Sequence, residues 1–134
     1  MKKNIYLSLI LFVFTVFVSK AQESEKTDAP KFTTFSVEDF KTKFKSNYIL
    51  LDVRSPEEFN EGHIKGALSM NVNDDDFVSK VKSLSKEKNV FVYCAAGIRS
   101  KKASEMLSNM GFQNVYNLSG GYDDLVKAGM PHEK

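Results

Sequence analysis

Residues 90–100 read VFVYCAAGIRS, and this stretch decides how the rest of the chain is interpreted. Its first four residues form a continuous apolar run of strand length, which is typical of a strand buried on both faces of a parallel sheet. A helix is predicted from about Ser100 to Met110, with Gly111 ending it. Ligands of open parallel sheets bind outside the carboxyl ends of the strands, so we expect a site at the connecting loop.

The loop that begins at Cys94 contains the residue types that hold a reactive anion. Its small residues let the backbone curl inward, and the N-terminus of the next helix adds positive potential. A thiolate at Cys94 would therefore have a lowered pKa. The residues expected to bind an anion are Ala95, Ala96, Gly97, Ile98 and Arg99, the last with paired side-chain donors. The alternative is an inert cysteine at the end of a strand, which is common for free Cys.

Outward from this loop, the chain alternates between apolar runs and amphipathic segments. Strands are predicted at residues 32–35, 48–53, 90–93 and 115–118, with an unclear segment at 64–72. Helices are predicted after Ser36, after Ser55, from Asp74–Asp76, and after the Ser119-Gly120-Gly121 turn. The pattern indicates an α/β domain with a central, mostly parallel sheet of about five strands and helices on both faces.

Composition narrows the classes of function. The 134 residues contain one Cys, which excludes an intrachain disulfide framework and a zinc site built from several Cys. The two His are far apart, so no metal site is expected. Without the first 21 residues, 16 basic and 17 acidic residues remain, and no basic patch indicates nucleic-acid binding.

The first 21 residues have the three parts of a secretory signal peptide. Lys2 and Lys3 precede an apolar run from Ile5 to Val18, and small residues precede Gln22. The alternative, a retained membrane anchor, needs about 20 apolar residues. We therefore expect a signal peptide at 1–21, a flexible leader at 22–31, a folded domain at 32–131, and an exported, periplasmic protein that has no membrane contact after cleavage.

Three separated motifs resemble those of rhodanese-type sulfurtransferases. The loop CAAGIRS (94–100) resembles their active-site loop. LDVRSPEEF (51–59) with GHIKGA (62–67) is similar to their upstream signature, and NLSGG (117–121) is similar to their glycine turn. The resemblance runs from about Thr33 to Ala128 and implies a rhodanese-like three-layer domain of the single-domain, exported bacterial type.

The resemblance implies sulfur transfer through a persulfide on Cys94. A small anionic donor such as thiosulfate, or a persulfide, would give its sulfane sulfur to the thiolate, and cyanide or a thiol would accept it, with ping-pong kinetics. Loop amides would stabilise the persulfide without a cofactor or metal. With no second Cys, the acceptor must come from outside the chain or from a second copy. The sequence leaves the oligomeric state open.

Four further residues are candidates for supporting the site. Arg54 follows a predicted strand, where it would either line the anion pocket or pair with Asp52 or Glu58; the family pattern favours the ion pair. Asp52 is expected to pair with a cation or with backbone donors rather than act as a base. His63 is expected to be structural, because a thiolate activated by its loop needs no base.

Other classes of function remain as alternatives. A persulfide carrier or binding module would load once and hand its sulfur to a partner protein. Related phosphatases have a Cys-x5-Arg loop, one residue longer than the Cys-x4-Arg spacing between Cys94 and Arg99. A redox thiol protein would normally have a resolving Cys. The loop also departs from the Gly-Ser/Thr-Gly pattern of mercaptopyruvate-preferring relatives, which favours thiosulfate or a persulfide as donor.

Overall fold

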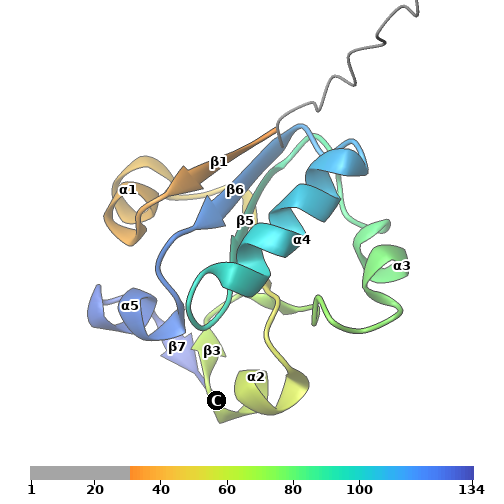
Figure 1. Ribbon diagram of the computed structural model, residues 1–134. Helices are drawn as coiled ribbons and strands as arrows, with labels where there is room; N and C mark the ends of the chain where they lie inside the picture. The colour runs from red at the N-terminus through yellow and green to blue at the C-terminus, as the bar shows by residue number, and fades with distance from the viewer. Residues whose placement is uncertain (1–30) are drawn as a thin grey trace, which may run out of the picture.

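A computed structural model describes residues 31–134, which form a three-layer α/β domain (Figure 1). The predicted signal peptide (1–21), and all but the last residue of the predicted leader (22–31), lie outside the described residues. The central sheet has the strand order β1-β6-β5-β2-β4, and every neighbouring pair is parallel. Its strands are β1 (Phe32–Phe35), β2 (Tyr48–Asp52), β4 (Leu68–Ser69), β5 (Asn89–Tyr93) and β6 (Asn114–Leu118). The predicted architecture is confirmed.

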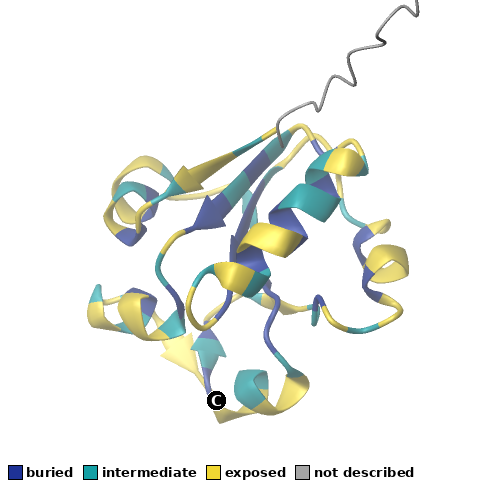
Figure 2. Ribbon diagram, viewed as in Figure 1, coloured by how far each residue is buried: buried dark blue, intermediate teal, exposed yellow. Residues whose placement is uncertain are grey.

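Both faces of the sheet are covered by helices. Side chains of β5 alternate between the faces: Val90 and Val92 pack with α3 (Phe77–Val81) and α4 (Ile98–Asn109). Phe91 and Tyr93 pack with α1 (Val37–Lys43) and α5 (Tyr122–Lys127). The central strands are accordingly buried along most of their length (Figure 2). This burial makes β5 a rigid support for the loop that follows it.

Local signals set the start of two helices as predicted. Ser36 caps α1 by accepting a hydrogen bond from the Asp39 N–H at 3.0 Å. A capping box opens α2 (Pro56–Glu61): Ser55 Oγ accepts from the Glu58 N–H, and Glu58 Oε2 accepts from the Ser55 N–H. Glu58 is therefore fixed at the first turn of α2, beside the carboxyl end of β2.

Three details differ from the sequence-based expectations. Helix α4 begins at Ile98 rather than Ser100, because Gly97 takes a left-handed conformation (φ 88°) that ends the loop early. Asp76 precedes α3 without capping it through its side chain, and the helix has five residues. The unclear segment near residue 64 contains β3 (His63–Ile64), which pairs antiparallel with β7 (His132–Glu133). Backbone pairing thus extends beyond residue 131.

Within residues 31–134, no helix has the length and apolar character needed to cross a membrane.

Candidate functional site: the Cys94 loop and the adjoining pocket

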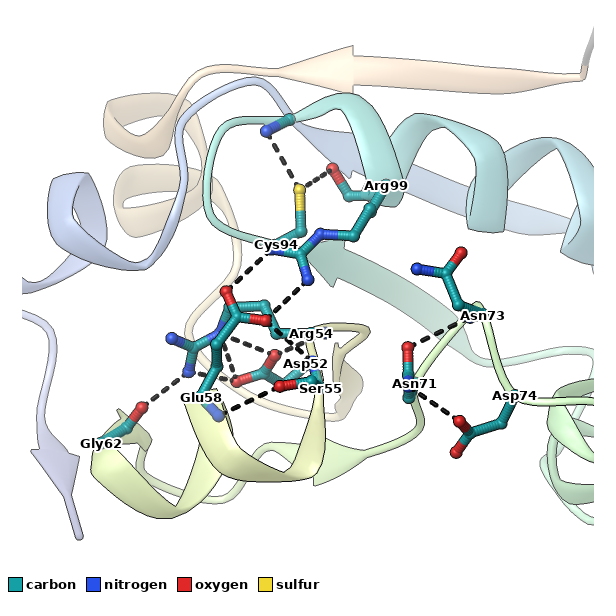
Figure 3. A network of polar contacts seen from close by, with 12 residues as sticks. Asp52, Arg54, Ser55, Glu58, Gly62, Asn71, Asn73, Asp74, Cys94 and Arg99 are labelled. Carbon is teal, nitrogen blue, oxygen red and sulfur yellow. Dashed lines mark hydrogen bonds and ion pairs between the residues drawn. The ribbon is translucent and has the colours of Figure 1, made fainter.

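Cys94 directly follows β5, with its side chain enclosed by its own loop. The residue is 1% exposed. Its Sγ accepts a hydrogen bond from the Gly97 N–H at 3.1 Å and lies 3.4 Å from the hydroxyl of Ser100 (Figure 3). The sulfur thus sits where the loop curls back onto the first turn of α4. The loop therefore curls inward around the sulfur, and we call this arrangement of Cys94, Gly97 and Ser100 the cradle.

The cradle favours the thiolate. Burial raises the pKa of Cys94, because it removes water from the charged form. Hydrogen bonds from the Ser100 side chain, and from the backbone N–H groups of Ser100, Ala96 and Gly97, act the other way and lower it. The net pKa of Cys94 lies below its ordinary value. Hydrogen bonding thus overcomes desolvation and leaves a thiol suited to nucleophilic attack.

A glycine turn from a different part of the chain fixes the loop from behind. The N–H of Tyr122 donates to the carbonyl of Cys94 at 2.8 Å. A Cβ on Gly121 would overlap the Ala95 carbonyl. On Gly97, a Cβ would lie 2.9 Å from the carbonyl oxygen of Ser119. Glycine at these two positions therefore allows the two loops to pack backbone against backbone.

Arg99 lies in the first turn of α4 and is paired with an acid. Its two terminal nitrogens donate to Glu58 at 2.7 and 2.9 Å (Figure 3). This hydrogen-bonded pair, opposed by partial burial, lowers the pKa of Glu58 to about 2. The pair ties α2 to the Cys94 loop. Arg99 was expected to offer its donors to an anion, and in the structure Glu58 takes them.

Arg54 and Asp52 form a buried ion pair. Asp52 accepts from the backbone N–H, Nε and Nη2 of Arg54, and Nη2 also donates to the carbonyl of Gly62 at 2.6 Å. The ring of Tyr122 covers the guanidinium, 4.4 Å from ring centroid to Cζ. Of the two predicted partners for Arg54, the structure selects Asp52, because Glu58 is turned toward Arg99.

Tyr93 joins the same network and was not singled out by its sequence. Its hydroxyl accepts from the N–H of Ile64 at 3.1 Å. Burial, together with a hydrogen bond to Asp52, raises the pKa of Tyr93 well above its ordinary value. The phenol therefore stays protonated and helps to satisfy the buried carboxylate of Asp52.

His63 makes its described contacts with α2 and β7. Its ring stacks on Phe59 at 3.7 Å between centroids, and Nδ1 lies 3.0 Å from the Phe59 carbonyl oxygen. Nε2 lies 3.5 Å from the carboxylate of Glu133 in β7. These contacts hold the end of α2 against β3 and β7.

An open pocket of about 350 Å³ adjoins the loop. It lies between α2 and α5, and Ala95 forms part of its wall. The other lining residues are Arg54, Glu58, Glu61, Gly62, Tyr122 and Asp123. Ile98, at the loop's outer edge, is 79% exposed.

Sequence reasoning missed several residues of this region. Ser100 was identified only as the start of a helix; a hydroxyl in the first turn after the loop is a signal that could have marked it as a partner of Cys94. Glu61 and Asp123 carried no such signal, because each is one of several acids on a short helix, and such acids are most often solvated. Their meeting depends on how α2 and α5 pack around β3, which the sequence does not reveal directly.

Comparisons with known proteins identify the family and the fold. The rhodanese-like domain family matches residues 36–128. Over 91 residues, the chain is 37% identical to thiosulfate sulfurtransferase 16, chloroplastic, of Arabidopsis thaliana, covering 60% of this chain and 76% of that protein. It is similar in structure to the crystal structure of a Rhodanese_3 like domain from Anabaena, with a TM-score of 0.61 and 34% identity, over 65% of this chain and 99% of that one.

A third relative is a longer protein. The chain is 40% identical over 91 residues to the tRNA uridine(34) hydroxylase of Cytophaga hutchinsonii. The match covers 66% of this chain but only 28% of that protein. A domain of this kind therefore also occurs within larger proteins that have a different named activity.

Proposed function

The chain belongs to the rhodanese-like domain family, and we propose that it transfers sulfane sulfur through a persulfide on Cys94. The observation that carries this proposal is the thiol's surroundings. Its sulfur accepts from the Gly97 N–H and lies beside the Ser100 hydroxyl, and its pKa is lowered. The same donors would stabilise the anionic outer sulfur of a persulfide.

The first half-reaction loads the sulfur. The Cys94 thiolate attacks the outer sulfur of thiosulfate, forming a new S–S bond. The bond between that sulfur and the sulfonate sulfur breaks, and sulfite leaves with the electron pair. A persulfide donor reacts in the same way and leaves as a thiolate. Neither route needs an external oxidant or a cofactor.

The second half-reaction unloads it. A nucleophile attacks the outer sulfur, the bond to Cys94 Sγ breaks, and Cys94 leaves as a thiolate. Cyanide would yield thiocyanate, and a thiol would yield a new persulfide. The acceptor comes from outside the chain, which has a single Cys. We further propose that this occurs in the periplasm after removal of residues 1–21, without nucleic acid as a partner.

A carrier without turnover is the second candidate. It is favoured by the pairing of Arg99 with Glu58, which leaves the loop with less free positive charge for thiosulfate. It is also consistent with the tRNA uridine(34) hydroxylase relative, in which the matched region is a small part of a longer chain.

Mass spectrometry combined with a turnover assay tests the proposal. The reduced protein is incubated with thiosulfate, its intact mass is recorded, and cyanide is then added while thiocyanate is followed. We expect a gain of one sulfur, its loss to cyanide, and repeated cycles; Cys94→Ser should do neither. Turnover in Cys94→Ser would overturn the mechanism, and a stable adduct without cycling would establish the carrier instead.

A further inference from the structure

The pocket beside the Cys94 loop contains charges of both signs. Arg54 lines it together with Glu61 and Asp123. We propose that this pocket binds the head group of an amino-acid thiol such as cysteine, with Arg54 contacting the carboxylate and the two acids contacting the ammonium group. The bound thiol would be the acceptor in the second half-reaction, so this proposal rests on the proposed function and names its substrate class.

Arg54 has one nitrogen left for a ligand. The residue is 5% exposed, and its Nε and Nη2 are occupied by Asp52 and Gly62. No hydrogen bond among the described residues uses Nη1. Among the described side chains, Asn117 Oδ1 is the one nitrogen or oxygen atom that is fully buried and has no hydrogen-bond partner. Arg54 Nη1 also has no partner, so it must be in contact with solvent. Because Arg54 lines the pocket, Nη1 can donate to the carboxylate of a ligand there.

The rim of the pocket carries uncompensated negative charge. Glu61 ends α2, and Asp123 lies in the first turn of α5. Both are exposed, and neither has an ion-pair partner among residues 31–134. Glu58, also in the pocket, is neutralised by Arg99. Two free carboxylates attract an ammonium group and repel a doubly charged anion, which distinguishes an amino-acid thiol from a second thiosulfate.

An ammonium group fits the rim better than a metal ion does. The described residues contain no group of three His, Cys, Asp or Glu side chains that could bind a metal. The volume of about 350 Å³ lies at the small end of ligand sites and suits a molecule of amino-acid size.

The pocket also borders the Cys94 loop. Ala95, the residue after Cys94, forms part of its wall. An amino acid held by its head group would direct a short thiol side chain toward that wall. Its thiolate would attack the outer sulfur of the Cys94 persulfide, releasing Cys94 as a thiolate and giving the amino-acid persulfide. The proton of the incoming thiol is lost to solvent, and no oxidant is needed.

Four small thiols test the ammonium and carboxylate groups separately, because they contain both groups, one of them, or neither. The persulfide-loaded protein is offered L-cysteine, cysteamine, 3-mercaptopropionate or 2-mercaptoethanol, and kcat/KM is measured for each. We expect the ratio for L-cysteine over 3-mercaptopropionate, which differ in the ammonium group, to fall about threefold to tenfold in Glu61→Gln/Asp123→Asn. The intrinsic reactivity of each thiol is the same with both proteins, so it cancels in this comparison. Glu57→Gln is the matched control, since Glu57 lies on α2 outside the pocket and should leave the ratio unchanged.

A binding measurement keeps the test independent of turnover. Cys94→Ser is titrated with S-methyl-L-cysteine and with S-methyl-3-mercaptopropionate while amide NMR shifts are followed. We expect only the amino acid to shift Gly62, Ala95 and Tyr122, and expect Glu61→Gln/Asp123→Asn to raise its Kd about threefold to tenfold. If both compounds bind equally, or neither binds, the head-group site is wrong. If sulfur transfer fails but this selective binding is seen, the proposed function is wrong and the site remains.

Discussion

Glu58 and Arg99 lie 41 residues apart in the sequence, yet the carboxylate of Glu58 accepts hydrogen bonds from both terminal nitrogens of Arg99, at 2.7 and 2.9 Å. Glu58 also closes the capping box of α2 through the Ser55 N–H. The Glu58 side chain therefore caps the start of α2 and also pairs with the Arg99 guanidinium, which is the positive charge of the Cys94 loop. An anionic donor that approaches Arg99 must compete with Glu58.

Removing this competition should improve the use of thiosulfate. In Glu58→Gln the amide oxygen can still accept from Ser55, so α2 keeps its cap, but the charge is lost and Arg99 is freed. We expect the KM for thiosulfate to fall about threefold, in line with a partly exposed ion pair. Steady-state kinetics with Glu57→Gln as the control measure this. An unchanged or higher KM in Glu58→Gln would show that Arg99 needs its partner in order to serve the site.

The same pair predicts how acid affects stability. The pKa of Glu58 is lowered from 4.5 to about 2, so its stabilising contribution is complete above the unfolded value and is lost as pH falls through the folded one. The difference in free energy of unfolding between the wild type and Glu58→Gln should therefore shrink from about pH 5 to pH 2. Urea titrations across this range measure it. A difference that is constant with pH would mean that the ion pair does not stabilise the fold.

The hydroxyl of Ser100 should set the reactivity of Cys94. In Ser100→Ala the thiolate loses a donor, its pKa rises, and alkylation by iodoacetamide at pH 7 should slow about tenfold, as expected for a hydrogen bond to a charged group. Ser104→Ala is the control: Ser104 is also buried in α4, but its hydroxyl donates to the Ser100 carbonyl. Equal alkylation profiles for the two variants would remove Ser100 from the site.

Gly121 should be required for the shape of the loop. In Gly121→Ala the new Cβ overlaps the Ala95 carbonyl, so the loop must move. We expect a loss of about 1–3 kcal/mol in stability, together with slower persulfide formation. Gly66→Ala serves for comparison, because Gly66 has φ 83° but no atom within 4 Å of the added carbon. That variant should lose stability alone, and a Gly121→Ala protein that forms persulfide normally would contradict the steric argument.

The buried pair of Asp52 and Arg54 should matter for folding. Asp52→Asn leaves a guanidinium that is 5% exposed without its counter-ion, which costs about 3–5 kcal/mol. Chemical denaturation measures this loss. Asp39→Asn breaks the exposed pair with Lys43 and should have little effect. If the two variants lose equal stability, the Asp52 pair is not the anchor of this network.

Local chemistry made part of this fold predictable. Ser36 and Ser55 could be predicted as N-caps, because each accepts a hydrogen bond from the N–H group only three residues later in the sequence. The burial of β5 could be predicted because its residues form a continuous apolar run. The sequence predicts that α4 begins at about Ser100, two residues after its start in the structure, because Gly97 has no side chain that could mark the cap. β3 was not recognised, because its partner β7 lies near the chain's end.

The candidate site also has a part that could be predicted from the sequence and a part that could not. The Cys94 loop could be predicted because strand, small residues and helix are contiguous. The pairing of Glu58 with Arg99, and the meeting of Glu61 with Asp123 at one pocket, depend on crossovers that bring distant segments to the same edge of the sheet. Charge and spacing along the chain do not determine which acid reaches which base.

The all-parallel sheet has a consequence for how such a protein can change over evolutionary time. Its strands deliver the Cys94 loop, α2 and α5 to one edge from separate crossovers. The nucleophile's cradle comes mostly from one of these segments, whereas the walls of the pocket come mostly from the others, with Ala95 as the shared residue. Substitutions at Glu61 or Asp123 could thus alter which molecules are accepted while the bond-making machinery stays intact. If the pocket selects the acceptor as proposed, selectivity and reactivity are encoded in different stretches of the gene, and selection can act on each separately.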